Sequence, residues 1–249
     1  MKVSVKTPLE IQKIREVGLI LRNLKNHLRQ IIKSSMTLNQ INDIAHDYIT
    51  QQQGIPSFLN YSGFPKSICT SVNEVLIHGV PSEYSLKPGD LLSLDIGVYK
   101  NGYHVDSAFS MIIDNIDNKK AQDLIKCAEE SFFNSIKNIK DGAHLSDIGK
   151  IIEETITSWN FFGTSLYCGH GIGKNLHEAP MILNYYEPSY DLILKTGMVL
   201  AIEPMVLDGS PETIVDKNDN WSVISKNHQL TAHYEHTIVI TKTGYEILT

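Results

Sequence analysis

Two aspartates, Asp95 and Asp106, flank an Asn-Gly pair at a spacing that could create a cation site. Asn-Gly favours a two-residue type I′ turn, because both central positions require positive φ. With Asn101 and Gly102 as the loop, Asp106 pairs opposite Gly97, and Asp95 lies on the same face as a diagonal neighbour. Two converging carboxylates in a buried sheet are too costly unless a proton or a cation lies between them. The hairpin therefore predicts a metal site.

Histidines supply a second class of candidates. His170 lies in the segment Cys-Gly-His-Gly-Ile-Gly, whose small residues leave its imidazole accessible to a metal or substrate. A glycine-rich turn with an incidental histidine is the alternative, and a phosphate loop is disfavoured because no Gly-Lys-Ser/Thr ending is present. His177 is less informative by itself, since surface histidines are common. His78 ends an apolar stretch, where a lone histidine is more often a hydrogen-bonded core residue than a catalyst.

Two glutamates lie within apolar, strand-like runs, where a carboxylate must be neutralised or bound. For Glu203 the alternative is an edge strand that points the carboxylate to water beside Pro204. Glu235 and His236 point to opposite faces of their strand, so at most one of them faces a given site. Four carboxylates and one imidazole suit two divalent cations better than a structural zinc. Such a pair can generate hydroxide near neutral pH and polarise a carbonyl, which is the chemistry of amide hydrolysis.

Two helices followed by strands are expected twice along the chain. Thr7-Pro8-Leu9-Glu10 predicts a capped helix start, and apolar residues recur from Ile11 to Leu28. A second helix is expected from Thr37 to Gly54. Strands are expected at about 67–71, 91–99 and 103–113, helices at about 120–139 and 145–158, and further strands within 163–249.

A short repeat accompanies this order, since Leu38-x-x-Ile41-x-x-Ile44 reappears as Leu145-x-x-Ile148-x-x-Ile151. One match of seven residues is weak evidence, because amphipathic helices resemble one another by chance. No linker separates the two parts. We therefore predict one α+β catalytic domain over residues 1–249, with similar halves at about 1–118 and 119–249 that share a sheet and a site at their junction.

The composition describes an ordinary folded protein. The chain has 249 residues, 42% hydrophobic and 20% charged, which is enough for a sizeable core. Its net charge of −6 argues against a nucleic-acid-binding body. The N-terminus lacks the apolar stretch of a signal peptide, and no run has the length of a membrane span. Three cysteines without metal-type spacing predict free thiols in a reducing cytosol.

These residues, in this order, resemble the type I methionine aminopeptidases. The resemblance runs through nearly the whole chain and is densest at Pro65–Pro81, Asp95–Asp106, Cys168–Gly173, Ala201–Met205 and Tyr234–Thr237. It implies the pita-bread (creatinase/aminopeptidase-like) fold, with two pseudo-symmetric halves around a central antiparallel sheet. It also implies a metallo-exopeptidase that removes the initiator methionine from nascent proteins and prefers a small second residue. The spacing from His170 to Glu203 leaves no room for the helical insertion of the type II enzymes. The simple bacterial form, without a zinc-finger or proline-rich N-terminal extension, is therefore expected.

The resemblance implies a role for each candidate. The metal ligands would be Asp95, Asp106, His170, Glu203 and Glu235, with Asp106 and Glu235 bridging two divalent ions (Co, Mn, Fe or Zn). A hydroxide held there would attack the methionine carbonyl, and Glu203 would carry the proton. His177 would stabilise the oxyanion, and His78 would support the substrate amide or the leaving amine. The free α-amine of the substrate would lie near the metal pair.

The resemblance also implies a methionine pocket, formed by Phe58, Tyr61, Phe64, Cys69, Leu176 and Trp221 together with His78 and His177. Three positions depart from the usual pattern, which often has cysteine at 58, tyrosine at 64 and phenylalanine at 176. We therefore expect a reshaped pocket with unchanged metal chemistry. A sodium or potassium site on backbone carbonyls is expected near Asn73, Val75 and Thr231.

Two other functions compete with this one. A proline-specific peptidase of the same fold usually carries an additional N-terminal domain. A non-enzymatic pita-bread module that binds peptides typically loses metal ligands, whereas all five are present here. The resemblance further implies a cytoplasmic monomer whose partners are nascent chains, without membrane or specific nucleic-acid binding. Ribosome contact would depend on Lys217 and Lys226, which make a thin basic patch.

Overall fold

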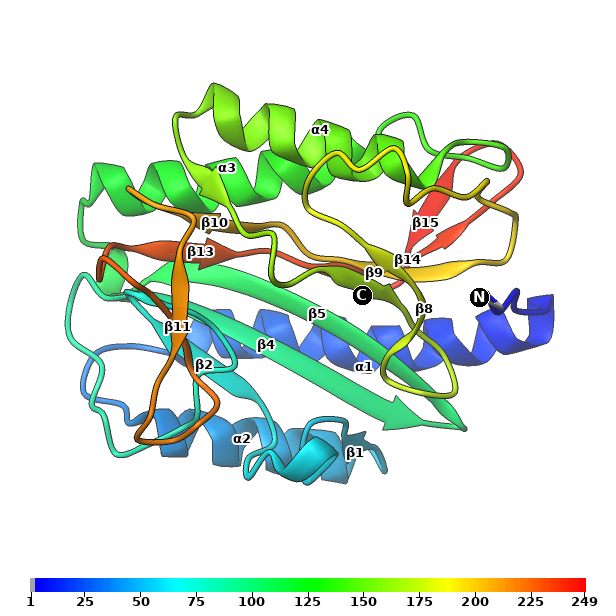
Figure 1. Cartoon of the computed structure of the whole chain (residues 1–249). Helices are drawn as coiled ribbons and strands as arrows, with labels where there is room; N and C mark the ends of the chain where they lie inside the picture. The colour runs from blue at the N-terminus through cyan, green and yellow to red at the C-terminus, as the bar shows by residue number, and fades with distance from the viewer. Residues whose placement is uncertain (1–2) are drawn as a thin grey trace.

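Within residues 3–249, four α-helices lie on the outside of a mainly antiparallel set of strands (Figure 1). This computed structural model describes residues 3–249, and residues 1 and 2 of the expected domain lie outside it. The helices are α1 (Pro8–Ile31), α2 (Leu38–Gln51), α3 (Lys119–Ile136) and α4 (Leu145–Ser158). The predicted cap of α1 is confirmed, because Thr7 Oγ1 accepts from the Glu10 amide and the Glu10 carboxylate accepts from the Thr7 amide.

The second helix ends earlier than the sequence predicts. It stops at Gln51, and the chain turns with Gln53 at φ 58°. Gly54 does not provide the left-handed residue. A methyl group on Gly54 would lie 3.1 to 3.2 Å from Ile49 and Val98, so this glycine allows close packing of the chain. The left-handed residue that terminates the helix is therefore Gln53, one position before the predicted Gly54.

The strands form four small sheets. The first sheet has β1 (Ile55–Pro56), β2 (Cys69–Val72), β4 (Leu91–Lys100) and β5 (Tyr103–Ile112). The second has β7 (Gly169–Gly171), β8 (Glu178–Ile182), β9 (Val199–Ile202), β14 (His236–Ile240) and β15 (Tyr245–Ile247). Two three-stranded sheets combine β6 (Phe162–Gly163), β10 (Met205–Leu207) and β13 (Thr231–His233), and β3 (Val75–Ile77), β11 (Thr213–Val215) and β12 (Val223–Ser225).

The β4–β5 hairpin has the register that the Asn-Gly turn predicts. Lys100 pairs with Tyr103, and Gly97 pairs with Asp106. Asp95 pairs with Ala108, so the two aspartates are diagonal neighbours on one face. The apolar residues that alternate with them are fully buried on the reverse face. The same strands thus fix both the core and the position of the carboxylates.

Two main hydrophobic cores lie between the helices and the strands. In the first, Leu21 and Leu28 of α1 pack with Leu94 and Val98 of β4. The second joins α3 and α4 to β9, β10, β13 and β14. Each helix pair thus covers its own group of strands, α1 and α2 on one side and α3 and α4 on the other (Figure 1). The expected boundary between the halves, at about residue 118, stays a prediction.

Candidate metal centre and its cavity

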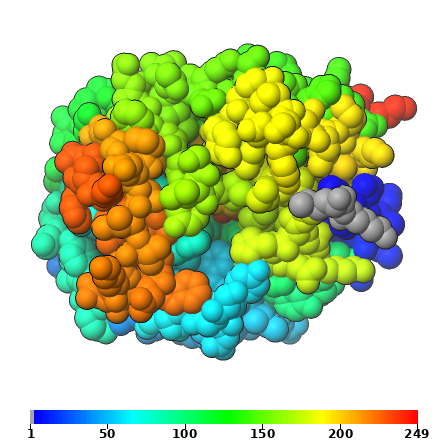
Figure 2. Space-filling model, in the orientation of Figure 1, coloured from blue at the N-terminus to red at the C-terminus, as the bar shows by residue number. Residues whose placement is uncertain are grey.

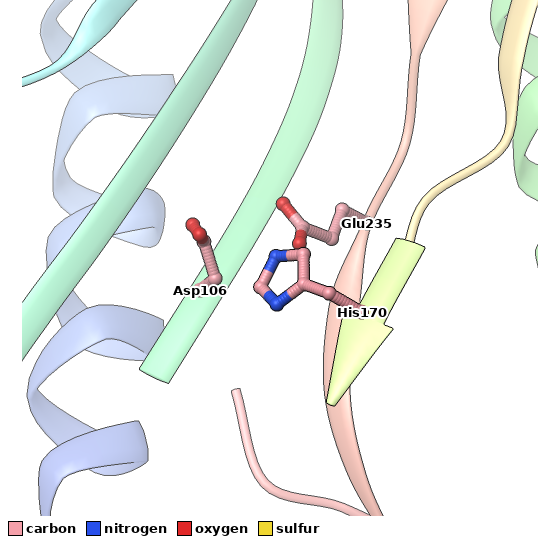
Figure 3. Close-up of side chains that lie close together, drawn as sticks. All are labelled: Asp106, His170 and Glu235. Atoms are coloured by element: carbon pink, nitrogen blue, oxygen red, sulfur yellow. The ribbon is translucent and has the colours of Figure 1, made fainter. Parts of the chain in front are cut away.

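Three of the five expected ligands form a compact cluster. Single ligand atoms of Asp106, His170 and Glu235 all lie within 4.8 Å of one another, and all three residues are buried. Figure 3 shows their side chains converging from β5, from β7 and from the chain just before β14. The cluster therefore joins residues that are far apart in the sequence. Two carboxylates and one imidazole are donors that a divalent transition metal accepts.

His170 presents one ring nitrogen to this cluster. Its Nδ1 lies 2.9 Å from the carbonyl oxygen of Gly171, which assigns the proton to Nδ1. Nε2 is then left with its lone pair. Burial lowers the pKa of His170 to about 3, so the ring is neutral. A neutral imidazole with one satisfied nitrogen is the form that binds a metal.

The backbone around Asp106 is fixed by hydrogen bonds from the second half of the chain. The Asp106 amide donates to Thr237 Oγ1 at 2.9 Å, and Thr237 Oγ1 donates to the Asp106 carbonyl at 2.8 Å. Its carboxylate Oδ1 accepts from the Ser107 amide at 2.9 Å. Nearby, the Glu235 amide donates to the Ala108 carbonyl at 3.0 Å. These bonds hold the two expected bridging carboxylates in one frame.

The carboxylate of Asp95 has a polar atom that no protein group within residues 3–249 satisfies. Its Oδ1 is buried and has no hydrogen-bond partner. Burial, opposed by His233, raises the pKa of Asp95 to about 6. Burial also raises the pKa values of Asp106, Glu203 and Glu235 well above their usual range, and neighbouring carboxylates add to this for Asp106 and Glu235. A cation would satisfy the unpaired oxygen and the four carboxylates together, so these residues fit a divalent metal.

Glu203 and Glu235 both lie where strands are interrupted. The apolar run around Glu203 was expected to be one strand, but β9 ends at Ile202 and β10 begins at Met205. Pro204 has no amide hydrogen, so it cannot continue the ladder at that point. Glu203 Oε1 lies 3.6 Å from His170 Nε2, which places the carboxylate in the site and excludes the edge-strand alternative. Glu235 likewise lies between β13 and β14.

A cavity of about 360 Å³ opens beside the cluster, and Figure 2 shows it as a hollow between the cyan, light-green and orange segments. Every expected pocket residue lines this cavity, together with all five expected ligands. Phe64 and Trp221 meet edge to face at 5.3 Å between ring centroids. Ser62, Ile77, Leu166, Tyr167, Cys168 and Met205 also line the cavity but were not predicted. The site thus has a polar metal end and an aromatic wall.

Two further histidines face this cavity. His177 Nδ1 lies 2.7 Å from the Tyr61 hydroxyl, and the ring of His177 lies 4.4 Å from that of His170. His78 has φ 57°, an uncommon backbone conformation for a residue other than glycine. Burial lowers the pKa of His78 to about 4 and also lowers that of His177, so both rings are neutral near pH 7.

The expected monovalent-cation residues also lie together. Thr231 Oγ1 is 2.8 Å from the carbonyl oxygen of Val75 and 3.1 Å from that of Asn73. Several oxygens therefore converge there, and the cation itself stays a prediction. All three cysteines are free, as expected.

Sequence reasoning missed two buried polar residues around the cluster. His233 lies two residues before Glu235, and strand alternation could have placed both on one side. Lys25 lies on α1, where a lysine among apolar residues suggests a solvated side chain. In the structure its Nζ donates to Ser107 Oγ, and Ser107 Oγ donates to the Glu235 carbonyl at 2.6 Å. Its side chain is therefore directed at the back of the cluster.

Comparisons with known proteins agree with this geometry. The model of metallopeptidase family M24 matches residues 12–242. The chain is 44% identical to methionine aminopeptidase 1 of Bacillus subtilis, with 99% of each chain covered. It is similar to the crystal structure of methionine aminopeptidase from Rickettsia prowazekii, with a TM-score of 0.96, 36% identity and 100% of each chain covered.

A more distant likeness concerns the fold alone. The Xaa-Pro dipeptidase from Bacillus anthracis has a TM-score of 0.77 and 23% identity, and the match covers 98% of this chain but 61% of that one. These likenesses confirm the pita-bread fold expected from the sequence. Within residues 3–249, no helix is both long and apolar enough to cross a bilayer.

Proposed function

The chain belongs to metallopeptidase family M24, and we propose that it removes the initiator methionine from the N-termini of nascent proteins. The observation that carries this proposal is the cluster of Asp106, His170 and Glu235 at the end of an aromatic-walled cavity. A metal cluster by itself is compatible with many hydrolases. The cavity beside it is lined by apolar and aromatic side chains, which suit an apolar side chain of the substrate's first residue.

We propose that five residues hold two divalent ions, with Asp106 and Glu235 shared between them. The unpaired Asp95 oxygen and the free His170 Nε2 support this ligand set. Ions in such a site supply an activated water near neutral pH and polarise the scissile carbonyl. Hard oxygen donors accept manganese, iron, cobalt or zinc, so the donor set does not select one of them.

The surrounding side chains then position the substrate. Tyr61 orients the His177 ring through its hydroxyl, which leaves His177 Nε2 to donate to the oxygen of the substrate carbonyl. His78 lies on the cavity wall as a neutral ring and can hydrogen-bond to the substrate amide. Glu203 carries the proton from water to the leaving amine. These roles extend the expectations from the sequence and need kinetic tests.

The aromatic wall would hold the methionine side chain. Phe58, Phe64 and Leu176 are nearly buried, and each lines the cavity. A preference for a small second residue is part of this proposal. A proline-specific activity is the competing enzyme function, and a comparison of Met-Ala and Ala-Pro peptides separates the two.

The decisive experiment removes one ligand at a time. Asp106→Ala and Glu235→Ala should each abolish turnover of a Met-Gly peptide in metal-loaded protein, while Asp117→Ala, an exposed control, should keep it. Circular dichroism checks that each variant is folded. Turnover by a metal-stripped Asp106→Ala protein would contradict the proposal. Failure of the wild-type protein to bind metal or hydrolyse any peptide would favour the non-enzymatic binding module.

We also propose that the protein acts in the cytoplasm as a monomer, with a sodium or potassium ion near Thr231. Transient ribosome contact has little support, because Lys226 is paired with Glu212 at 3.1 Å. That pair reduces an already thin basic patch. Sedimentation of the purified protein alone tests the monomeric state, and sedimentation with ribosomes tests the ribosome contact.

A further inference from the structure

His233 carries a buried imidazole beside the cluster. The proposed reaction does not explain why this imidazole lies there. It ends β13 and is 1% exposed, and its Nε2 has no hydrogen-bond partner within the described residues. Buried polar atoms of this kind are uncommon and call for a cause. The cause should be a group that the nitrogen faces.

Glu203 is that group. Its Oε2 lies 3.5 Å from His233 Nε2, while its Oε1 lies 3.6 Å from His170 Nε2. The carboxylate is therefore flanked by two imidazoles, with one oxygen directed toward each. Both separations exceed an ordinary hydrogen bond, so a small adjustment on metal binding would close the contact to His233.

The backbone of His233 is well fixed for such a role. His233 pairs with Met205 in the β10–β13 ladder, and Met205 follows Glu203 by two residues. The His233 amide donates to Ser110 Oγ at 3.1 Å, and Ser110 Oγ donates to the His233 carbonyl at 2.9 Å. Strands β10, β13 and β5 thus hold the imidazole and the carboxylate in a constant relation.

We propose that His233 is a positioning residue for the metal centre. Its Nε2–H donates to Glu203 Oε2, which leaves Oε1 for the ion that Glu203 shares with His170. Hydrogen bonds to ligating carboxylates orient them and tune the metal that they bind. His233 therefore selects which Glu203 oxygen binds the ion and which stays available for proton transfer. This inference rests on the metal site of the proposed function.

Cobalt binding to the metal-free protein tests the inference without any peptide. Co²⁺ is titrated into the wild type, His233→Leu, His233→Gln and His27→Leu, with the visible absorption bands of the bound ion as the readout. His27 is an exposed histidine on α1 and serves as the control. The leucine variant should lose about ten- to a hundredfold in affinity for one ion and show changed band intensities.

The glutamine variant separates positioning from direct ligation. Its side-chain amide can donate to Glu203 but does not replace an imidazole ligand, so its affinity should stay within about threefold of the wild type. A glutamine variant as weak as the leucine variant would mean that His233 binds the ion itself, and this would overturn the inference. An unchanged leucine variant would overturn it as well.

His233→Asn and His233→Gln form a second comparison, for the case in which His233→Leu does not fold. Where His233→Leu lacks the wild-type circular dichroism, His233→Asn replaces it, because its shorter amide does not reach Glu203. His233→Asn should then weaken Co²⁺ binding relative to His233→Gln, and equal binding would overturn the inference. Failure of the proposed function is distinct, because the wild type itself would then bind no Co²⁺.

Discussion

At the residue scale, Asp95 and Asp106 differ although they face the same site. Asp106 is 4% exposed, and its backbone is bonded to Thr237. Asp95 lies in β4 between β2 and β5, and its Oδ1 is buried without a hydrogen-bond partner among the described residues. Asp106 also belongs to the compact cluster with His170 and Glu235, whereas Asp95 does not. The two carboxylates should therefore make unequal contributions to metal binding.

Substitution of each aspartate tests this difference. Asp106→Asn should prevent stable binding of both proposed ions, because Asp106 would serve both of them, whereas Asp95→Asn should first empty one site. Elemental analysis after dialysis against limiting Mn²⁺ gives the number of ions per chain. Equal stoichiometry in the two variants would contradict the assignment, and Asp117→Asn provides an exposed control.

Lys25 is a second residue whose environment makes a testable difference. It is 3% exposed, its Nζ donates to Ser107 Oγ, and it lies 3.4 Å from His236 Nδ1. Burial, assisted by Arg29, lowers the pKa of Lys25 to about 7. The unfolded chain therefore binds more protons than the folded one between pH 7 and the ordinary lysine pKa of 10.5. The free energy of unfolding should rise with pH across this window. Below pH 7 the buried ammonium group exerts its full destabilising effect.

Replacement of Lys25 by methionine should stabilise the metal-loaded protein. Near pH 6.5 the gain should be about 1–4 kcal/mol, because a buried charge is exchanged for an apolar chain and Ser107 keeps its bond to Glu235. The gain should shrink toward pH 10. Urea unfolding at several pH values measures it, with exposed Lys242→Met as the control. A loss of stability at pH 6.5 would show that the ammonium group is needed behind the metal centre.

The candidate ligands could be picked out as single residues in the sequence, but the buried polar residues around them could not. Carboxylates in apolar segments and a histidine among glycines are visible as chemical exceptions in the sequence. Lys25 is not, because nothing local indicates that a helix lysine is buried, and for His233 strand alternation indicates only the side that it shares with Glu235. Their burial results from packing between segments that are distant in the chain.

At the element scale, the hairpin shows how far local rules reach. The Asn-Gly turn fixed the complete register of β4 and β5, because a two-residue loop leaves only one pairing. A capping box also predicted the start of α1, and α2 begins after Thr37 as expected, with a capping box that was not predicted. The interruptions at Glu203 and Glu235 were not predicted. An apolar run predicts a continuous strand, although here the strands are interrupted where Glu203 and Glu235 turn toward the cluster.

Phe58 and Gly97 form a contact between the pocket and β4. A methyl group built on Gly97 would lie 2.7 Å from Ser57 Cβ and 2.8 Å from Phe58 Cε1. Part of the Phe58 ring therefore lies over Gly97, and this part of the ring does not narrow the pocket. Gly97→Ala should destabilise the protein by about 1–3 kcal/mol through overpacking.

A double-mutant cycle tests whether these two positions are coupled. Phe58→Leu removes the ring edge, so it should recover part of the loss caused by Gly97→Ala, and Ser57 accounts for the remainder. Chemical denaturation gives the four free energies of unfolding. Additive effects would mean that Phe58 does not depend on the glycine. Gly244→Ala is the control, because nothing lies within 4 Å of the added methyl group.

At the scale of the whole molecule, the metal centre joins the two parts of the chain. Asp95 and Asp106 come from the β4–β5 hairpin, and the other proposed ligands come from residues after 169. The Ala108–Glu235 backbone pair links the same regions. Bound ions should therefore stabilise the complete fold, since they bind the folded state and not the separated segments.

Removal of the metal should lower the melting temperature by an amount that grows with pH. Burial raises the pKa of Asp95 to about 6, above its ordinary value of 3.8. Its stabilising contribution to the metal-free protein is thus present below the unfolded pKa and is lost as pH rises through 6. Metal binding strengthens over the same range, because its ligands must be deprotonated. Thermal unfolding with Mn²⁺ or with a chelator, at pH 5 to 8, should show a widening gap. A constant gap would mean that the clustered carboxylates are not what the metal neutralises.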